Sequence, residues 1–410
     1  MKSKFKTILL ASLFLIASPV FSQNENEAAL TEIISGAGFE NVSVAGAGDH
    51  LFVAYENRLF RFEVEALSEF LLLIAPHIEN YRQITILIKN KNIPVVQISM
   101  NKNDLIDWQK KVINNAEFAE LIDIKFDNLR DSENVFENTG VINSSNMKFD
   151  LVVKPTYKFQ FGIFSDPVLY QLNFTPHVEF GLWKGMTGLY ELTIPLHNDF
   201  TPREDSVRTS MIVVNQTFPL SDNYFLSGTV GFFTQNRYGL DLDTRGYFLN
   251  GDLSVGLNVG YTGYASFSTK RFYYSDLYLW TVSANIDYRI TEYDLTVGLT
   301  AGKFLMNDNT IRVDINREFG EIQVGFFAMR STNGVSNGGV NISIPLFPSK
   351  YWKPGLFRIR TTENLGFTYL VKTDLSDLIG LKYDTGFRIK NFIERLNPNF
   401  IINYLSKRLN

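Results

Sequence analysis

The chain of 410 residues contains no cysteine. This absence excludes disulfides, thiolate catalysis, cysteine-ligated metals and lipid attachment at an N-terminal cysteine. The four histidines are scattered along the chain and lack a metal-binding spacing such as H-E-x-x-H. They are His50, His77, His177 and His197. We therefore predict structural roles for His77 and His177, and neither a metal nor a cofactor.

The sequence also lacks an excess of basic charge and a recognisable catalytic motif. Its net charge is −4 and only 20% of its residues are charged, so no nucleic-acid partner is predicted. There is no G-x-S-x-G nucleophile elbow, and the glycine clusters at residues 36–38 and 46–48 have no third glycine in register, so they predict turns. Ser210 and His197 are expected near one rim, which leaves an outer-membrane lipase as a third hypothesis, but no spacing supports a triad. We predict that the protein is not an enzyme.

Long apolar runs are absent except at the N-terminus. Lys2, Lys4 and Lys6 precede an apolar run at residues 7–21, and Val20-Phe21-Ser22 offers a cleavage site. This layout predicts a signal peptide at residues 1–22. The alternative is a membrane anchor, but the run is short for a span of roughly 20 residues. An exported chain is expected.

The most frequent pattern in the sequence is the alternation of apolar residues with small or polar ones, above all at residues 251–346. Leu253, Val255 and Leu257 alternate with small or polar residues, and the same two-residue period recurs at residues 282–289, 295–302, 311–316 and 340–344. Such a period indicates extended chain with one apolar and one polar face. A transmembrane barrel explains both faces, because lipid contacts the apolar face and a hydrated lumen contacts the polar face. We therefore predict a transmembrane antiparallel β-barrel at residues 148–372, with about 12 strands and an even count.

Aromatic residues make up 14% of the chain and gather near the predicted strand ends. Interfacial girdles of a membrane barrel would place them there. The pairs in question are Phe232-Phe233, Tyr273-Tyr274 and Tyr351-Trp352, together with Trp280.

Charges of both signs recur on the face that should line the lumen. The candidates are Glu191, Asp287, Arg289, Arg312 and Asp314. One interpretation is a set of ion pairs that neutralise one another inside the barrel. The other is a polar track for a hydrated polymer or ion. A barrel of this size lies between a filled small barrel and an open porin, so conduction is not implied.

The barrel is preceded by a predicted small α/β domain at residues 23–130. Helical spacing occurs at residues 28–34, 65–78 and 104–113, and strand patterns occur at residues 42–44, 51–55, 59–64, 84–88 and 95–98. Residues 131–147 are polar and rich in Asn and Ser, which predicts a linker. The tail at residues 373–410 carries an amphipathic helical pattern. It is expected to cap the barrel or pack on the small domain, or alternatively to contact the membrane surface or a partner.

Two passages resemble the YjbH family of bacterial exopolysaccharide and capsule proteins. The first has GFENV at residues 38–42 and VAYENRLFR at residues 53–61. The second has REFG at residues 317–320, GGVNISIPL at residues 338–346 and TTEN at residues 361–364. The resemblance implies an outer-membrane barrel with a periplasmic α/β module that works with polysaccharide secretion machinery and is not an enzyme. It supplies no catalytic residues. Larger members carry the barrel and the α/β unit in duplicate, and this chain has room for one set.

These observations lead to one main functional hypothesis. The protein is expected in the cell outer membrane, in contact with lipid, with its N-terminal domain in the periplasm. There it would assist export or surface assembly of an exopolysaccharide or capsule, with polysaccharide or the export machinery as partner. The alternative is a general diffusion channel, similar to a porin, for small solutes.

Overall fold

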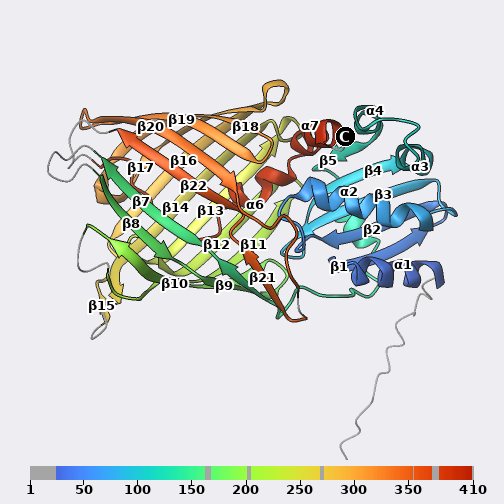
Figure 1. Cartoon of the computed structure of the whole chain (residues 1–410), viewed down its shortest axis with the longest axis horizontal. Helices are drawn as coiled ribbons and strands as arrows, with labels where there is room; N and C mark the ends of the chain where they lie inside the picture. Colours follow the sequence, from blue (N-terminus) through green and yellow to red (C-terminus); the bar gives the residue numbers. More distant parts are fainter. Residues whose placement is uncertain are drawn as a thin grey trace, which may run out of the picture.

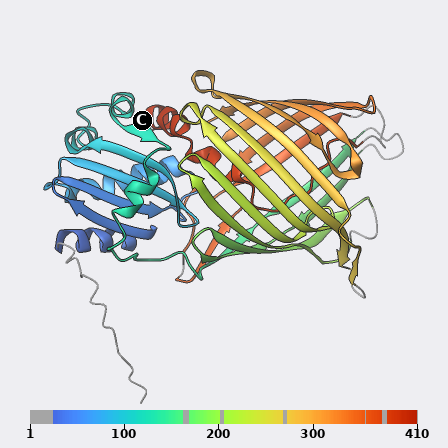
Figure 2. The same ribbon diagram turned by 180° about the vertical axis from the view of Figure 1, so that it is seen from behind.

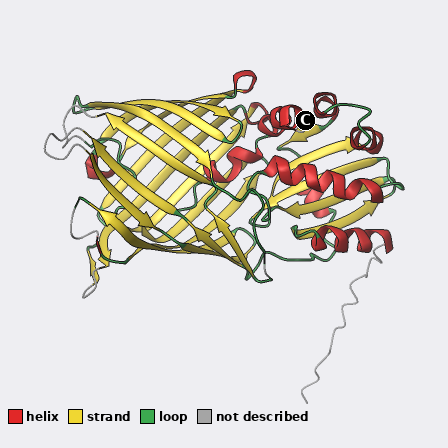
Figure 3. Ribbon diagram, viewed as in Figure 1, coloured by secondary structure: helices red, strands yellow, loops and turns green. Residues whose placement is uncertain are grey.

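The computed structural model describes residues 25–161, 168–200, 205–267, 272–353, 355–371 and 378–408. The predicted signal peptide and Lys372, at the predicted end of the barrel, lie outside these ranges. A small α/β domain sits end-on against a large closed barrel (Figure 1). The α-helices gather at the domain end, while the barrel wall consists of strands (Figure 3). None of the helices in the described ranges is both long and apolar enough to cross a membrane.

The α/β domain is built on a five-stranded sheet in the order β1-β2-β3-β4-β5. Its elements are α1 (Glu25–Gly36), β1 (Glu40–Ala47), β2 (His50–Glu56), α2 (Glu63–Ile74), η1 (Ala75–His77), β3 (Gln83–Asn90), β4 (Ile93–Asn101), α3 (Lys102–Gln109), α4 (Asn115–Leu121), β5 (Asp123–Lys125) and α5 (Leu129–Asn134). Strands β2 and β3 are parallel, and the other neighbours are antiparallel. The parallel pair requires a crossover, and α2 provides it.

One expectation for this domain is wrong. Residues 59–64 are not a strand, because the Asn57 side chain accepts hydrogen bonds from the backbone N–H groups of Leu59 and Phe60, and α2 then begins at Glu63. Such a local turn competes with extended pairing.

Residues 131–147, predicted as a linker, connect the α/β domain to the barrel and pack against the domain on the way. They include the end of α5, and Leu129 and Phe136 are buried in one cluster on the second face of the sheet. Ile142 forms a β-bridge with Val42 of β1. The few apolar residues that hold this connection against the domain are not apparent in a segment of largely polar composition.

The barrel wall comprises ten unbroken strands and three interrupted ones. The unbroken strands are β10 (Met186–Asn198), β11 (Arg208–Ser221), β12 (Tyr224–Phe233), β13 (Arg237–Phe248), β14 (Leu253–Phe267), β16 (Leu279–Ile290), β17 (Leu295–Lys303), β18 (Asn309–Phe319), β19 (Ile322–Ser331) and β20 (Ser336–Pro345). The interrupted ones are β6 (Phe149–Val153) with β7 (Pro155–Phe161), β8 (Val168–Phe174) with β9 (His177–Trp183), and β21 (Phe357–Thr361) with β22 (Asn364–Val371). The short strand β15 (Phe272–Tyr274) extends the hairpin of β14 and β16, and η3 (Leu249–Gly251), η4 (Thr291–Tyr293) and η5 (Leu305–Asn307) lie in turns.

Within the described residues the wall therefore has thirteen positions, not an even number near 12. An odd number of alternating strands leaves the first and last running in the same direction. The barrel accordingly closes through a parallel pair between β21 and β6, and its other pairs are antiparallel. The sequence pattern gives each strand its faces but does not specify which strands meet at closure.

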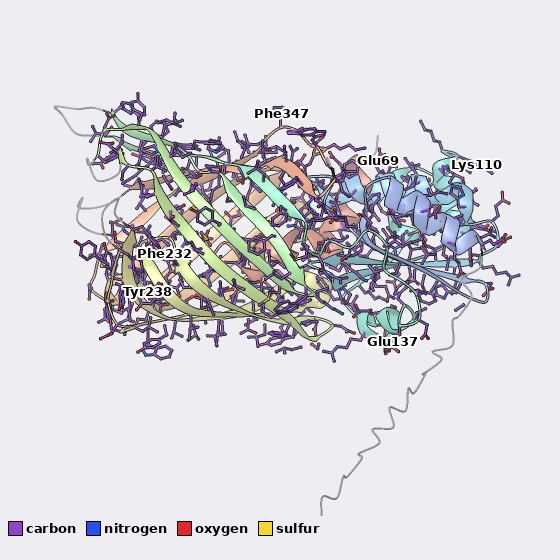
Figure 4. All side chains as sticks on the ribbon, turned by 90° about the horizontal axis from the view of Figure 1, so that it is seen from below. Glu69, Lys110, Glu137, Phe232, Tyr238 and Phe347 are labelled. Atoms are coloured by element: carbon purple, nitrogen blue, oxygen red, sulfur yellow. The ribbon has the colours of Figure 1, made fainter. Side chains whose placement is uncertain are left out.

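The outer face of the wall is apolar. Leu240, Leu242, Ile286 and Ile315 are each more than 40% exposed on it. Phe347, in the connection that follows β20, is 88% exposed, whereas Glu69, Lys110 and Glu137 stand on the surface of the α/β domain (Figure 4). Water-facing and apolar surfaces are thus divided between the two units, as expected when one of them contacts lipid.

The predicted aromatic girdle is correct only in part. Tyr273, Tyr274, Trp280 and Trp352 are exposed as expected. Phe232, Phe233 and Tyr351 are instead buried. Phe233 points inward, where its ring stacks on Tyr383 at a centroid distance of 5.2 Å. An interfacial role requires exposure, so these three do not belong to a girdle.

Candidate functional site

The C-terminal segment of the chain runs through the barrel lumen. At the end far from the α/β domain, the Gly380 backbone N–H donates to Asp308, which precedes β18, over 2.6 Å. Further along, α6 (Ile389–Ile393), η6 (Glu394–Leu396) and α7 (Pro398–Arg408) bring the chain out onto the α/β domain. Figure 2 shows these helices between the barrel and the domain. We call residues 378–396 the lumen segment.

Acidic side chains of the wall hold the lumen segment. The Tyr383 hydroxyl donates to Asp241 over 2.6 Å, and the Arg388 guanidinium pairs with the same carboxylate over 2.6 Å. The Ile389 backbone N–H donates to Asp243 over 2.8 Å. Because Asp241 and Asp243 are almost fully buried, the segment supplies the donors that their carboxylates need.

The end of the tail is part of the core of the α/β domain. Phe62, which precedes α2, contacts Phe400 and Tyr404 of α7 edge-on, at centroid distances of 5.7 and 5.4 Å. Ile401 and Leu405 are completely buried in the same cluster. The amphipathic pattern of the tail thus corresponds to packing on the domain, and the lumen segment is held at both ends.

The α/β domain contributes its own element to the mouth of the barrel. The tip of the β3–β4 hairpin carries Lys91, whose ammonium donates to Asn215 on β11 over 3.1 Å and lies 4.4 Å from the Phe387 ring. Burial lowers the pKa of Lys91 to about 7, against the opposing influence of Glu179. The Gly185 N–H donates to the Lys91 carbonyl, and Gly185 has a φ of +79° that favours glycine. Hairpin tip and lumen segment therefore meet inside the barrel.

Two sizeable polar cavities lie among the described residues of the lumen. The larger, of about 520 Å³, lies between the wall, the hairpin tip and the lumen segment. The smaller, of about 240 Å³, lies on the other side of the segment, against β13 and β16. Charged and amide side chains line both, and the charges of the larger cavity have opposite signs in close pairs, such as Glu179 with Arg360 over 2.9 Å. Such cavities suit a hydrated, hydrogen-bonding group.

The five predicted lumen residues all have partners of opposite charge. Glu191 accepts from Lys154 over 2.8 Å and from Ser210 over 3.0 Å. Asp287 lies 2.8 Å from both Arg245 of the wall and Lys390 of the lumen segment.

Arg289 pairs with Glu318 over 2.8 Å and with Asp294 over 3.3 Å. Arg312 pairs with Asp314, two residues along β18, over 2.6 Å. This arrangement agrees with the ion-pair interpretation. Asp287 and Asp314 lie on either side of Gly298 and line the smaller cavity, whereas Glu191 lines the larger one, so the five residues do not share one surface.

Ser210 and His197 do not come together. Ser210 donates to Glu191 inside the wall, whereas His197 pairs with Asp199 over 2.8 Å and stacks on Tyr170. Over the ranges that the structure covers, no group of His, Asp and Glu has an arrangement that could hold a metal ion.

A buried charge cluster fixes the α/β domain to the closing strands of the barrel. Arg358 of β21 pairs with Glu40 of β1 and with Asp150 of β6, and Glu40 also accepts from Lys148 and Lys353 over 3.2 and 3.1 Å. Arg358 is 3% exposed and Glu40 is fully buried. Burial alone would raise the pKa of Glu40, but the three cations hold it below its ordinary value. We call Glu40, Lys148, Asp150, Lys353 and Arg358 the docking cluster.

Sequence reasoning missed the acidic wall of β13 and the docking cluster. A signal for the first was available, since Asp241, Asp243 and Arg245 stand at every second position of one strand and Leu240 and Leu242 alternate with them on the other face. The tail carries the complementary cations Arg388 and Lys390. The docking cluster had no local signal, because its members come from distant parts of the chain.

Comparison with known proteins links this architecture to a family. The family model described as "Exopolysaccharide biosynthesis protein YbjH" matches residues 16–349. No curated protein matches the chain.

Among solved structures, the chain is similar to OmpTdeltaL8, a loop L8 deletion mutant of OmpT, an outer membrane protein of Vibrio cholerae. Sequence identity is 10% and the TM-score is 0.29, over 55% of this chain and 93% of that one, too low a similarity to support an argument. The family match, by contrast, spans the α/β domain and most of the barrel. The chain therefore belongs to the YjbH family, whose model is described as an exopolysaccharide biosynthesis protein.

Proposed function

We propose that the protein is a non-enzymatic barrel of the outer membrane that assists export or surface assembly of an exopolysaccharide, with the α/β domain in the periplasm. The family supports a role in exopolysaccharide biosynthesis. The apolar outer face of the wall and the polar surface of the domain support a barrel in lipid with a water-facing domain at one end.

One observation carries the choice of an accessory over a diffusion channel. The chain's own C-terminal segment passes through the lumen and is hydrogen-bonded to Asp308, Asp241 and Asp243. Free diffusion of solutes requires a continuous water path, and this segment lies across it. The remaining polar cavities match the chemistry of hydrated polyhydroxyl chains, which offer many donors and acceptors and no large apolar face.

Deleting the gene tests the proposal. We expect less polysaccharide at the cell surface or in the medium than in a complemented strain, with unchanged uptake of small solutes. Surface and released polymer are quantified by sugar analysis, and uptake by growth on limiting small solutes. Normal polymer in the deletion strain would contradict the proposal, and reduced uptake would favour the channel.

The lumen ion pairs yield a separate expectation. Replacing Arg289 and Arg312 with Gln leaves the carboxylates of Glu318 and Asp314 without their partners. We expect the barrel to lose about 3 kcal/mol of stability, while polymer export is retained. Heat-modifiability on gels measures the first and surface polysaccharide the second. If export were lost from a barrel of normal stability, these arginines would contact the transported polymer instead of only balancing charge.

A further inference from the structure

The closing seam of the barrel is hydrogen-bonded along only part of its height. Strands β21 and β6 pair over five residues, from Phe357 with Phe149 to Thr361 with Val153. The Thr362 N–H to Val153 carbonyl bond, of 2.9 Å, follows. Beyond it lie β7 and β22, neighbours in the wall (Figure 1), and within the described residues no backbone ladder joins them.

A ladder is missing here although both strands are regular. Strand β7 pairs on its other side with β8, and β22 pairs on its other side with β20. Unsatisfied backbone groups facing hydrocarbon cost several kcal/mol each. Membrane barrels avoid that cost by closing fully, so an unladdered stretch at the closure is a departure that calls for a functional explanation.

Aromatic side chains close this stretch from outside. Phe367 of β22 stacks on Tyr157 of β7 at a centroid distance of 6.1 Å, and Phe159 lies 6.5 Å from it. The Tyr157 hydroxyl donates to the Gly366 carbonyl over 3.0 Å. Side chains can change rotamer without breaking the wall, whereas a ladder of backbone bonds cannot open so locally.

The larger cavity reaches the inner side of the seam at the point where the backbone ladder ends. Gly366 is paired with Ser343, which lines the larger cavity, so both face the lumen. A Cβ added at Gly366 would meet nothing within 4 Å. The cavity is lined from both sides of the seam, by Val152 and Lys154 and by residues 362–364.

The cavity behind the seam retains hydrogen-bonding capacity. Within the described part of the chain, the buried Asn364 Oδ1 and His177 Nδ1 atoms have no hydrogen-bond partner, although His177 Nδ1 lies 3.6 Å from the Glu191 carboxylate. The neighbouring charges are already matched, since Glu179 pairs with Arg360 and Glu191 with Lys154. A neutral polyhydroxyl group could satisfy these free atoms without disturbing the ion pairs.

We propose that the stretch between β7 and β22 is a lateral portal from the lumen to the membrane. It admits an amphiphile whose saccharide head occupies the larger cavity and whose apolar chain stays in the bilayer. The ligand class rests on the proposed function in polysaccharide export. The aromatic side chains of Tyr157, Phe159 and Phe367 cover the portal on its outer side. The β21–β6 ladder stays paired when these side chains move.

Hydrogen exchange tests the seam without reference to any polymer. In the purified full-length protein in phospholipid nanodiscs, we expect peptides covering β7 and β22 to exchange faster than peptides covering β14 and β16, which are laddered on both sides. Equal protection of the two sets would overturn the portal.

Cross-linking in cells tests passage. Because the chain has no cysteine, a Tyr157→Cys/Phe367→Cys variant has two thiols only, which a short membrane-permeant bismaleimide can join across the seam. The matched control is Tyr261→Cys/Trp280→Cys, an outward pair whose rings stack at 4.3 Å on the laddered strands β14 and β16.

We expect cross-linking of the seam to reduce surface polymer to the level of the deletion strain, with no change in the cross-linked control. Normal export through a cross-linked seam would overturn the portal, as would an equal loss in the control. If the deletion strain itself makes normal polymer, the proposed function fails. Hydrogen exchange then still decides whether the seam is open.

Discussion

Replacing Arg388 and Lys390 with Gln is expected to turn a barrel whose lumen is blocked into one that conducts cations. Both side chains belong to the lumen segment, and they pair with Asp241 and Asp287 at 2.6 and 2.8 Å. Removing Arg388 leaves the buried Asp241 carboxylate without its cation, at a cost of about 3 kcal/mol. Asp287 retains Arg245 and loses only its bond to the lumen segment. The segment should therefore spend more time away from the wall, and the uncovered carboxylates should favour cations over anions.

Planar-bilayer recording of the purified protein measures this effect. The unmodified protein should show rare openings, and the double variant frequent openings with cation preference. Arg395→Gln is the matched control, because Arg395 pairs with Glu363, whose side chain is 49% exposed, so little is lost. A silent double variant would mean that the anchors at Gly380 and α7 keep the segment in place alone. Anion preference would contradict the assignment of Asp241 and Asp287 as the exposed charges.

The wall of the barrel was predictable because alternation is a local property. Residues such as Leu257 and Ile286 show their outward faces within a few positions of sequence. The odd strand number was not predictable in this way. It depends on the parallel pairing of Phe357–Thr361 with Phe149–Val153, some 200 residues apart, and on interruptions that split three strands. Local patterns carry no information about such closure.

The lumen segment shows a second limit of prediction from the sequence. The helical spacing of Ile401 and Leu405 was visible, and packing on the α/β domain was among the expectations. Residues 378–388 lack any period, because they form an extended connection whose place is set by individual donors, such as Tyr383 and Arg388. The five predicted lumen residues could be named because charge on an alternating face is conspicuous. Their partners came largely from other strands and from the tail, beyond the reach of spacing.

Loss of Arg358 is expected to have the largest effect on the assembly of the two units. Its guanidinium pairs with Glu40 of the domain and Asp150 of the barrel, and it is 3% exposed. Arg358→Met removes the charge and retains most of the volume, so two buried carboxylates lose a shared cation. We expect a loss of about 3–5 kcal/mol, seen as easier proteolysis between the domain and β6. Arg82→Gln is the control, because the Arg82–Asp49 pair is solvent-exposed and should contribute under about 1 kcal/mol.

The docking cluster also predicts how the assembly responds to acid. The pKa of Glu40 is lowered in the folded protein, so the native state binds fewer protons there than the unfolded state. Its contribution to stability is complete above the ordinary carboxyl pKa of about 4.5 and is lost as pH falls through the lower, native value. Proteolysis between the domain and the barrel should therefore accelerate below about pH 4.5 in the unmodified protein. In Glu40→Gln it should already be fast at neutral pH and respond less to acid. An acid response that persists in full in Glu40→Gln would assign the effect to other carboxylates, and the docking cluster would then not be the joint that holds the two units together.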